Sequence, residues 1–550
     1  MSLGFRATGL EVPEPLRAQL TGDDVAARLV RKDPTLWGPE AESEAAIRLG
    51  WLDLPATSRE LVGRLAELHA ELQSEGLDRV VLCGMGGSSL APEVICRTAG
   101  VPLVVLDTTD PGQVAAAMAD LERTVVVVSS KSGGTVETDS QRRAFIGAFA
   151  AAGLDEDRIG ARFVVVTDPG SPLSETASAM GARAVFLADP DVGGRYSALS
   201  AFGLVPAALA GVDVGALLEE AAELAEQLAE PGNAALELGV ALGAGFHTGR
   251  DKVTLADGGR GGRDTGIQGF GDWAEQLIAE STGKQGRGLL PVVVESADAP
   301  GATGPDALLA VVGGDPVDPG PSVGVTGPLG AQFLGWEYAT AVAGRVIGIN
   351  PFDQPNVTES KENTQRLLDA GFADEPPLAT IGAVELRAAN GLLDGVDLTQ
   401  HDGVSLALEA LLAAVPPRGY LAVMAYLDRR RDARTGELRA ALARRTEHAV
   451  TFGWGPRFLH STGQYHKGGP QTGAFLQLTG AYTEDLPVPD RPYTFGTLHT
   501  AQAAGDRQAL ADRGRPLLHL HLTERAAGVE QLLDASCAAT WTRIGSGEHR

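Results

Sequence analysis

The sequence predicts an α/β fold of doubly wound parallel sheets with helices on both faces. Three observations support this prediction. Short runs are apolar at every position, longer amphipathic segments alternate with them, and glycine-rich turns stand where a run ends and a segment begins. Strands that are apolar on both sides belong to sheets covered on both faces. Ligands of such sheets bind at the carboxyl ends of the strands.

The first α/β unit is expected over residues 76–230, after an N-terminal helical segment at 1–75. A second unit is expected over 231–373, joined to the first by the Ala/Leu/Glu-rich helix Val214–Glu230. The expected strands of the two units are Val80–Leu82, Leu103–Leu106, Thr124–Val128, Phe163–Val166, Val253–Leu255, Leu289–Val293 and Leu308–Val312. Helices are expected at 267–282 and 328–342, and a surface loop at Gly313–Pro321.

A third α/β region is expected over residues 378–550, because Pro376 and Pro377 can neither continue a helix nor donate to a sheet. Its clearest strands are Tyr420–Ala425 and Leu517–Leu522, and its clearest helices are Ser405–Ala414 and Arg525–Ala538. A chain of 550 residues is too long for one core, which agrees with several units.

The charge balance excludes non-specific binding to nucleic acid or to an anionic membrane. Lys and Arg number 45 against 71 Asp and Glu, a formal net charge of −26. Three cysteines without CxxC spacing, no secretory leader and no membrane-length apolar run predict a cytoplasmic protein. Four of the six lysines lie in the motif segments described next, and we expect these lysines to mark an anion site.

Two loops between a strand and a helix are candidate anion sites. Gly84–Ser89 is glycine-rich, but Ser89 replaces the third glycine of a dinucleotide motif, which disfavours a nicotinamide site. Ser129–Thr138 (SSKSGGTVET) offers hydroxyls, two glycines and a lysine at a helix start, a pattern that suits a monophosphate. The alternative for each loop is a structural turn, in the second case one that caps the helix.

Five motifs in order resemble those of glucose-6-phosphate isomerases: GMGGSS at 84–89, SKSGGT at 130–135, VGGRYS at 192–197, ESTGK at 280–284, and NPFDQ at 350–354 followed by Lys361. The resemblance implies two sugar-isomerase (SIS) domains, each a doubly wound parallel sheet in an αβα sandwich, plus the additional C-terminal region. It implies an aldose–ketose isomerase of glycolysis and gluconeogenesis that interconverts glucose 6-phosphate and fructose 6-phosphate through a cis-enediolate. It further implies a homodimer that needs neither cofactor nor metal.

The resemblance also assigns roles to individual residues. Glu280 matches the base, Arg195 the residue that stabilises the enediolate, and Lys361 a participant in ring opening. The positions that match substrate and phosphate contacts are Gly86, Gly87, Ser88, Ser130, Lys131, Ser132, Gly134, Thr135 and Thr138.

The chain departs from the family pattern at the ring-opening histidine, because residues 284–361 contain no histidine. The candidate replacement is the segment Leu459–Gly469 (LHSTGQYHKGG) of the third region. We expect this segment to reach the site from the same or a partner subunit, with His466 as the first candidate and His460 as the second. The alternative is a surface loop whose histidines have no catalytic role.

Two other functions stay open at this stage. The enzyme could isomerise another sugar phosphate, such as mannose 6-phosphate, or the chain could be a non-catalytic sugar-phosphate sensor. The occurrence of Glu280, Arg195 and Lys361 together favours an enzyme.

His519 and His521 share one face of a strand, as two metal ligands would. No third ligand follows at a suitable spacing, so we expect core or interface histidines instead.

Overall fold

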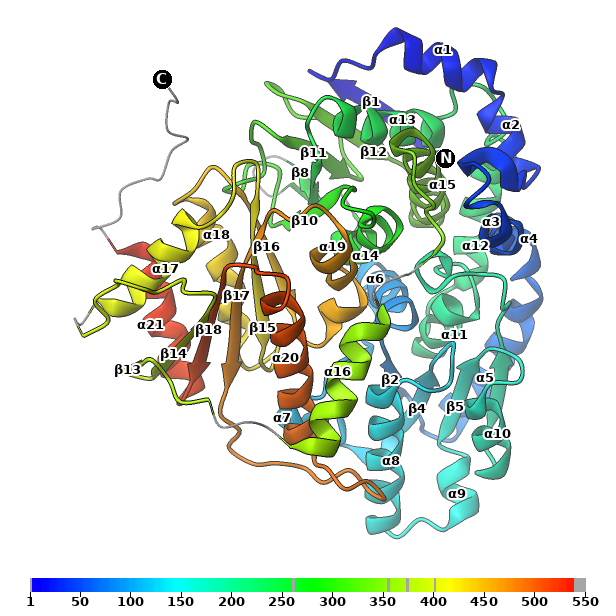
Figure 1. Cartoon of the computed structure of the whole chain (residues 1–550). Helices are drawn as coiled ribbons and strands as arrows, with labels where there is room; N and C mark the ends of the chain where they lie inside the picture. Colours follow the sequence, from blue (N-terminus) through cyan, green and yellow to red (C-terminus); the bar gives the residue numbers. More distant parts are fainter. Residues whose placement is uncertain are drawn as a thin grey trace, which may run out of the picture.

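Three sheets, each flanked by helices, organise the computed structural model of this protein (Figure 1), which describes residues 2–259, 263–264, 266–353, 357–371, 375–399 and 402–538. The first sheet is parallel throughout, in the order β3-β2-β4-β5-β6. Its strands are β2 (Arg79–Gly84), β3 (Val104–Leu106), β4 (Thr124–Ser129), β5 (Phe163–Thr167) and β6 (Ala184–Leu187). Runs of valine fill β2, β4 and β5 and are buried on both faces, so the predicted doubly wound sheet is confirmed here.

Helices precede, separate and follow the strands of the first sheet. They are α1 (Glu14–Gly22), α2 (Val25–Val30), α3 (Glu42–Arg48), α4 (Leu54–Thr57), α5 (Glu60–Ser74), α6 (Leu90–Ala99), α7 (Pro111–Ala117), α8 (Val136–Ala151), α9 (Glu156–Gly160), α10 (Pro172–Ala179), α11 (Ala201–Ala210) and α12 (Val214–Ala225). The expected connector helix therefore ends five residues earlier than predicted, at Ala225.

The second sheet has the order β1-β12-β11-β7-β10, and only its edge strand β1 is antiparallel. Its strands are β1 (Gly4–Thr8), β7 (Lys252–Ala256), β10 (Leu290–Val294), β11 (Ala307–Val312) and β12 (Ser322–Thr326), and β8 (Gly258–Gly259) pairs with β9 (Arg263–Asp264) separately. The segment expected to be helical thus also supplies a strand, β1, to this sheet. Its helices are α13 (Ala234–His247), α14 (Phe270–Thr282), α15 (Leu329–Ile347) and α16 (Val357–Ala370).

The third sheet has the order β13-β14-β18-β17-β15-β16, parallel from β16 to β18 and antiparallel beyond. Its strands are β13 (Ala379–Ile381), β14 (Val384–Ala389), β15 (Tyr420–Tyr426), β16 (Ala449–Trp454), β17 (Gly473–Gly480) and β18 (Leu517–Leu522). Its helices are α17 (Gly403–Ala413), α18 (Glu437–Ala443), α19 (Gly463–Gly468), α20 (Phe495–Ala511) and α21 (Arg525–Cys537), with the short 3-10 helix η7 (Arg457–His460) before α19.

The third region covers one face of the second sheet. A single buried cluster joins apolar side chains of β10 and β11 to the face of the third sheet that carries Tyr420, Met424 and Phe475. The other face of the third sheet packs against α17, α18 and α21 in a separate cluster. The third region therefore belongs to the body of the molecule, since without it the second sheet would expose an apolar face to water.

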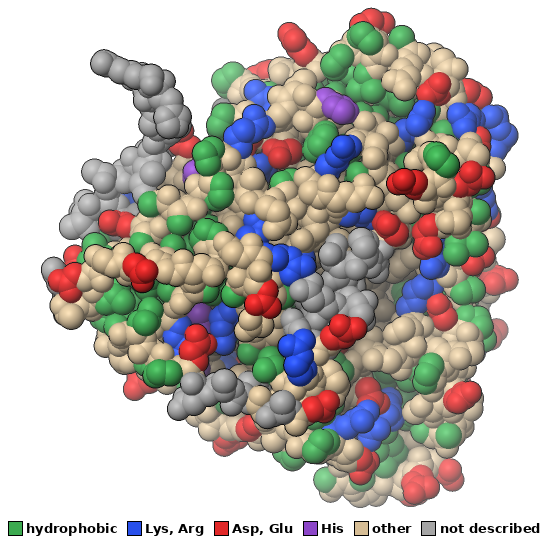
Figure 2. Space-filling model, viewed as in Figure 1, with side chains coloured by type: hydrophobic (Ala, Val, Ile, Leu, Met, Phe, Trp, Pro, Cys, Tyr) green, Lys and Arg blue, Asp and Glu red, His purple; other side chains and the backbone are tan. Residues whose placement is uncertain are grey.

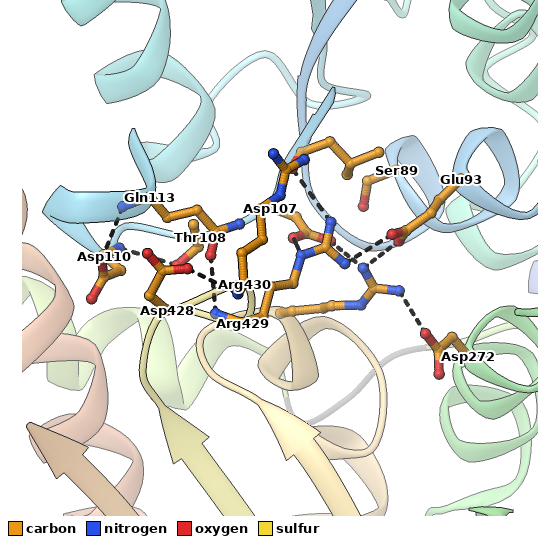
Figure 3. A network of polar contacts seen from close by, with 12 residues as sticks. Ser89, Glu93, Asp107, Thr108, Asp110, Gln113, Asp272, Asp428, Arg429 and Arg430 are labelled. Atoms are coloured by element: carbon orange, nitrogen blue, oxygen red, sulfur yellow. Dashed lines mark hydrogen bonds and ion pairs between the residues drawn. The ribbon is translucent and has the colours of Figure 1, made fainter. Parts of the chain in front are cut away.

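Ion pairs connect the third region to the first two units (Figure 3). Arg457 contacts Glu93 at 2.5 Å, Asp107 at 2.7 Å and Asp272 at 3.1 Å, and Arg429 contacts Glu93 at 2.9 Å. Burial alone would raise the pKa of the Glu93 carboxyl, but the charges of Arg457 and Arg429 lower that pKa to about 2.

None of the helices within the described residues is both long enough and apolar enough to cross a membrane.

Replacing Arg457 with methionine should destabilise the protein. The change leaves the buried carboxylates of Glu93 and Asp107 with less positive charge, and we expect a loss of about 3 kcal/mol in unfolding free energy, measured by urea denaturation. The exposed Arg434, which pairs with Glu437 at 3.0 Å and also with Glu530, provides the control, since Arg434→Gln should leave the unfolding free energy close to the parent value. Equal losses in the two variants would contradict this role for Arg457.

Candidate active site

Helix α14 places the carboxylate of Glu280 in a buried position near the end of the helix. Gln276, one turn earlier, donates from Nε2 to Oε1 of Glu280 at 3.3 Å. The guanidinium NH1 of Arg195 lies 3.7 Å from Oε2 of Glu280. Burial raises the pKa of Glu280, although Arg195, Gln276, His460 and Lys284 act in the opposite direction.

Arg195, in the one-turn 3-10 helix η5 (Gly194–Tyr196), is held by several hydrogen bonds. Its Nε donates to Oγ of Ser281 at 2.8 Å, and its NH2 donates to the carbonyl oxygens of Pro351 at 2.5 Å and Asp353 at 3.2 Å. Only 1 % of the side chain is exposed. These contacts fix the guanidinium while NH1 faces Glu280, so a permanent positive charge lies beside a buried carboxylate.

The first glycine loop packs directly against this pair. Gly86 has φ +55°, and a Cβ there would lie 2.7 Å from Nε2 of Gln276 and 3.1 Å from Cβ of His460. A Cβ on Gly87 would lie only 2.0 Å from the carbonyl oxygen of Gly194. These two positions therefore require glycine because three segments approach them closely. This steric requirement is separate from any role of the glycines in phosphate binding. Ser88, beside them, is buried.

The second loop, predicted to bind phosphate, turns from β4 into the start of α8. Ser130 and Thr135 share a hydrogen bond of 3.0 Å between their hydroxyl groups, and Ser132 Oγ accepts from the backbone N–H of Gly134 at 3.3 Å. The buried Oγ1 of Thr138 has no hydrogen-bond partner among the described residues. Hydroxyl groups and the first N–H groups of α8 thus gather at a helix N-terminus, where an anion is stabilised.

The third region supplies His460 and Gln502 to the site. Nε2 of His460 lies 3.2 Å from Oε1 of Glu137, in the first turn of α8. Gln502, on α20, donates to the same oxygen at 2.7 Å and accepts from Thr109 at 2.6 Å. Within the Leu459–Gly469 segment, it is thus His460, the second candidate histidine, that lies beside Glu137 and Gly86, and its part in a site stays a prediction.

His466, the first candidate, lies elsewhere. Its ring centre is 5.8 Å from that of Tyr420 and 5.2 Å from that of Phe475, within the cluster between the second and third sheets. Neither ring nitrogen has a hydrogen-bond partner among the described residues, and burial lowers the pKa of His466 well below its usual value. The structure therefore places this imidazole in an aromatic core, and the contact with Glu137 belongs to His460.

The lysines expected to mark an anion site are each paired with an aspartate where their side chains are described. The three Nζ–Oδ distances, Lys131–Asp168, Lys284–Asp353 and Lys467–Asp506, are all 2.6 Å. Burial and the neighbouring Arg195 lower the pKa of Lys284 to about 8. Lys361 belongs to α16, but its side chain lies outside the described part of the chain. The internal pairing of three lysines reduces the charge they can offer to a ligand.

Several residues of the site were not predicted from the sequence. Gln276 could have been found, because it precedes Glu280 by four residues on one helix and therefore lies on the same face. Glu137, Gln502 and Ser281 carry no local signal of their own, since each acquires its role from a contact with a distant segment.

Comparison with known proteins gives an independent view of the chain. The sequence model of the phosphoglucose isomerase family matches residues 69–247. A glucose-6-phosphate isomerase of Rubrobacter xylanophilus is 30% identical over 390 residues, which cover 57% of this chain and 88% of that protein. One of Clostridium perfringens is 26% identical over 402 residues, covering 59% of this chain and 88% of that protein.

Solved structures agree with this result. A hypothetical protein of Thermus thermophilus aligns with a TM-score of 0.54 at 26% identity, over 66% of this chain and 100% of that one. A glucose-6-phosphate isomerase of Chlamydia trachomatis aligns with a TM-score of 0.54 at 20% identity, over 68% and 89%, which supports the fold. Each of these alignments leaves about a third of this chain uncovered.

Glu275, on the same helix as Glu280, should make stability depend on pH. Burial and the nearby Asp272 raise the pKa of Glu275 from 4.5 to about 8, although Ser461 donates to its carboxylate at 3.0 Å. Between these pH values the folded state binds a proton that the unfolded state releases, so the unfolding free energy should fall as pH rises from about 4.5 to about 8.

The variant Glu275→Gln cannot titrate and should lose this part of the slope, gaining on the order of 2 kcal/mol relative to the parent at pH 8. Urea denaturation at pH 5 and pH 8 measures the difference. The exposed Glu67→Gln should keep the parent slope. An unchanged slope in Glu275→Gln would show that Glu275 is ionised throughout this range.

Proposed function

The chain belongs to the glucose-6-phosphate isomerase family, and we propose that it interconverts glucose 6-phosphate and fructose 6-phosphate with Glu280 as the base. The observation that supports this assignment most directly is the buried Glu280 carboxylate with the Arg195 guanidinium 3.7 Å away. A carboxylate and a fixed cation are the two groups that proton transfer next to a carbonyl requires.

The proposed reaction moves one proton within the open-chain sugar. Glu280 takes the proton from C2 of the aldose, and the C1 carbonyl oxygen gains negative charge as the enediolate forms. The protonated Glu280 then returns the proton to C1, while the hydroxyl proton on O2 moves to O1, which yields the ketose. A base works best when its pKa is close to the working pH, so the raised pKa of Glu280 suits this step.

Arg195 supports the enediolate in this proposal. Its guanidinium is held by Ser281, Pro351 and Asp353 before any substrate binds. A charge that is already in place needs no reorganisation when the negative charge develops on the sugar oxygens. An enzyme is therefore favoured over a sugar-phosphate sensor, which has no need of a buried acid–base pair.

The phosphate group of the substrate is assigned to the loop 130–138. Ser130, Thr135 and Thr138 contribute hydroxyl groups there, and α8 contributes the positive end of its dipole. Ser132 and Gly134 belong to the same turn, and Gly86, Gly87 and Ser88 form the neighbouring wall. Lys131 faces Asp168, so its contribution is a partly neutralised charge.

Ring opening is assigned to His460 in place of His466. A histidine beside a carboxylate can hold a proton and deliver it to the ring oxygen O5, while the hydroxyl proton on O1 is lost and the C1–O5 bond breaks. Glu137 orients the imidazole, and Gln502 orients Glu137. Lys361 keeps the ring-opening role that its motif implies. The cytoplasmic location and the homodimer also stay predictions.

Glu280→Gln should abolish most of the isomerase activity. The amide cannot accept the C2 proton, and we expect kcat to fall by about 10²–10⁴-fold. The assay couples the conversion of fructose 6-phosphate to glucose-6-phosphate dehydrogenase. The exposed Glu67→Gln serves as the matched control and should retain parent activity. An inactive parent, or an active Glu280→Gln, would overturn the proposal.

His460→Ala should affect cyclic substrates selectively. Erythrose 4-phosphate cannot form a furanose ring, because its C4 hydroxyl carries the phosphate. We expect the variant to lose about 10²-fold in kcat/KM with fructose 6-phosphate, while its rate of solvent-deuterium exchange at C2 of erythrose 4-phosphate stays near the parent value. His466→Phe, which keeps an aromatic ring in the core, should change neither rate. Equal losses on both substrates would assign His460 to proton transfer at carbon instead.

A further inference from the structure

The face of the third sheet that carries Tyr420 and Phe475 is apolar against the second sheet but becomes polar toward β18 and β14. On β14, β18 and β17, the side chains of Glu385, Arg387, His519, His521 and Thr479 alternate with aliphatic ones. The aliphatic side chains pack with α17 and α21 on the opposite face. Sheets covered by helices on both sides do not need polar residues for packing, so this face calls for another explanation.

A cavity of about 810 Å³ lies over this polar face, between the sheet and the helices α20 and α16. These two helices pack along each other (Figure 1). Tyr426 at the end of β15 and Gly480 at the end of β17 line the cavity. The chain leaves β15 for β16 on one side and returns to β17 on the other, so one end of the cavity reaches the switch point where α/β sheets bind ligands, while the rest extends over the sheet to Leu517.

Arginines and carboxylates both line the cavity, and Glu385 is half-buried there like Arg387 and Arg507. Glu375 and Asp512 are exposed at its edge. Arg387 is paired with Glu385 at 2.9 Å. For Arg507, the nearest described carboxylate is that of Glu375 at 3.7 Å. Figure 2 shows basic and histidine side chains together in a hollow of this part of the surface. Arg507 also donates from NH1 to Oε1 of Gln477 at 2.9 Å, so Arg387 has a carboxylate within hydrogen-bond distance whereas Arg507 has a neutral amide there.

The hydrogen bonds of the two histidines leave one buried ring nitrogen, Nδ1 of His519, without a partner among the described residues. Oγ1 of Thr479 lies 2.8 Å from Nε2 of His519 and 2.9 Å from Nδ1 of His521. A hydroxyl has one proton, so it can donate to His519 while it accepts from His521. In that arrangement Nδ1 of His519 carries a proton, and in the reverse arrangement it is an acceptor; in both, this buried atom has no hydrogen-bond partner among the described residues. A buried polar atom without a partner is destabilising, and a ligand that forms a hydrogen bond with it removes that cost.

We propose that this cavity is a second ligand site, which binds the phosphate or carboxylate group of a small metabolite between Arg507, Arg387 and His519. The site is separate from the proposed isomerase site, because neither Glu280 nor Arg195 nor the loop 130–138 lines the cavity. It is also distinct from a metal site, since no three metal-ligating side chains cluster within the described residues.

Counting bound phosphate tests this proposal. Equilibrium dialysis with radiolabelled inorganic phosphate should give two sites per parent chain, one in the loop 130–138 and one in the cavity. The double variant Ser130→Ala, Thr135→Ala should keep the cavity site only. Adding Arg507→Gln, or separately Arg387→Gln, should weaken the remaining site about tenfold or more. Circular dichroism confirms that each variant is folded.

A matched control and a second anion complete the experiment. Arg444→Gln, which removes an exposed guanidinium near the end of α18, should leave phosphate binding unchanged. Malonate that displaces the cavity phosphate more strongly than a sugar phosphate does would identify a carboxylate ligand, and the reverse order a phosphate ligand. The proposal is wrong if the double variant Ser130→Ala, Thr135→Ala binds neither anion. It is also wrong if adding Arg507→Gln and adding Arg387→Gln both leave phosphate binding as strong as in that double variant. The isomerase assay is independent of this count, so a failure of the proposed activity leaves the cavity result intact.

Discussion

The apolar contact between the second and third sheets is the constraint on which the rest of the structure depends. Leu290, Val292 and Val294 of β10 share one buried cluster with Tyr420 and Met424 of β15. Because this contact fixes the third region against the second sheet, η7 and α20 can bring His460 and Gln502 to the start of α8. Gly283 at the end of α14 takes part in the same fit, because a Cβ there would lie 2.7 Å from Cα of Tyr465. The packing between the second and third sheets thus sets the positions of His460 and Gln502 at the candidate active site.

The formal net charge of −26 does not show where charged side chains lie in the folded protein. Buried cations stand in small compensated groups, such as Arg457 among Glu93, Asp107 and Asp272. Arg195 is less completely balanced, since its one described carboxylate contact is at 3.7 Å. Placing an incompletely balanced cation in a dry site is costly for stability, but it leaves attraction available for an anionic substrate or intermediate.

The sequence allowed the sheets of the first two units to be predicted well, because valine-rich runs such as β4 are apolar at every position. It did not reveal β6, β12 or β1, and the five residues of β1 pair with β12, far along the chain. Glu280 and Arg195 were predicted by the order of the motifs, and the structure brings them together. The choice between His460 and His466 could not be made in the same way. Five residues, which include a break between two short helices, separate them, so the direction of each ring depends on tertiary contacts: His466 packs with Tyr420 and Phe475, and His460 contacts Glu137. For a similar reason, the sequence did not indicate that three of the lysines form ion pairs with Asp168, Asp353 and Asp506, because these partners are distant in sequence.

The pairing of β1 with β12 also bears on the order in which the chain can fold. Gly4 lies opposite Thr326, and Thr8 lies opposite Ser322. During synthesis, β1 must therefore wait until the first α/β unit and most of the second have been made. The entropic cost of closing a loop of this length is only slightly larger than that of closing a loop of medium length. Contacts between residues so far apart in sequence nevertheless form slowly. In that interval the outer side of β12 is an open sheet edge, which can pair with another nascent chain. The strand made first thus acts as the last protective cover of the second sheet.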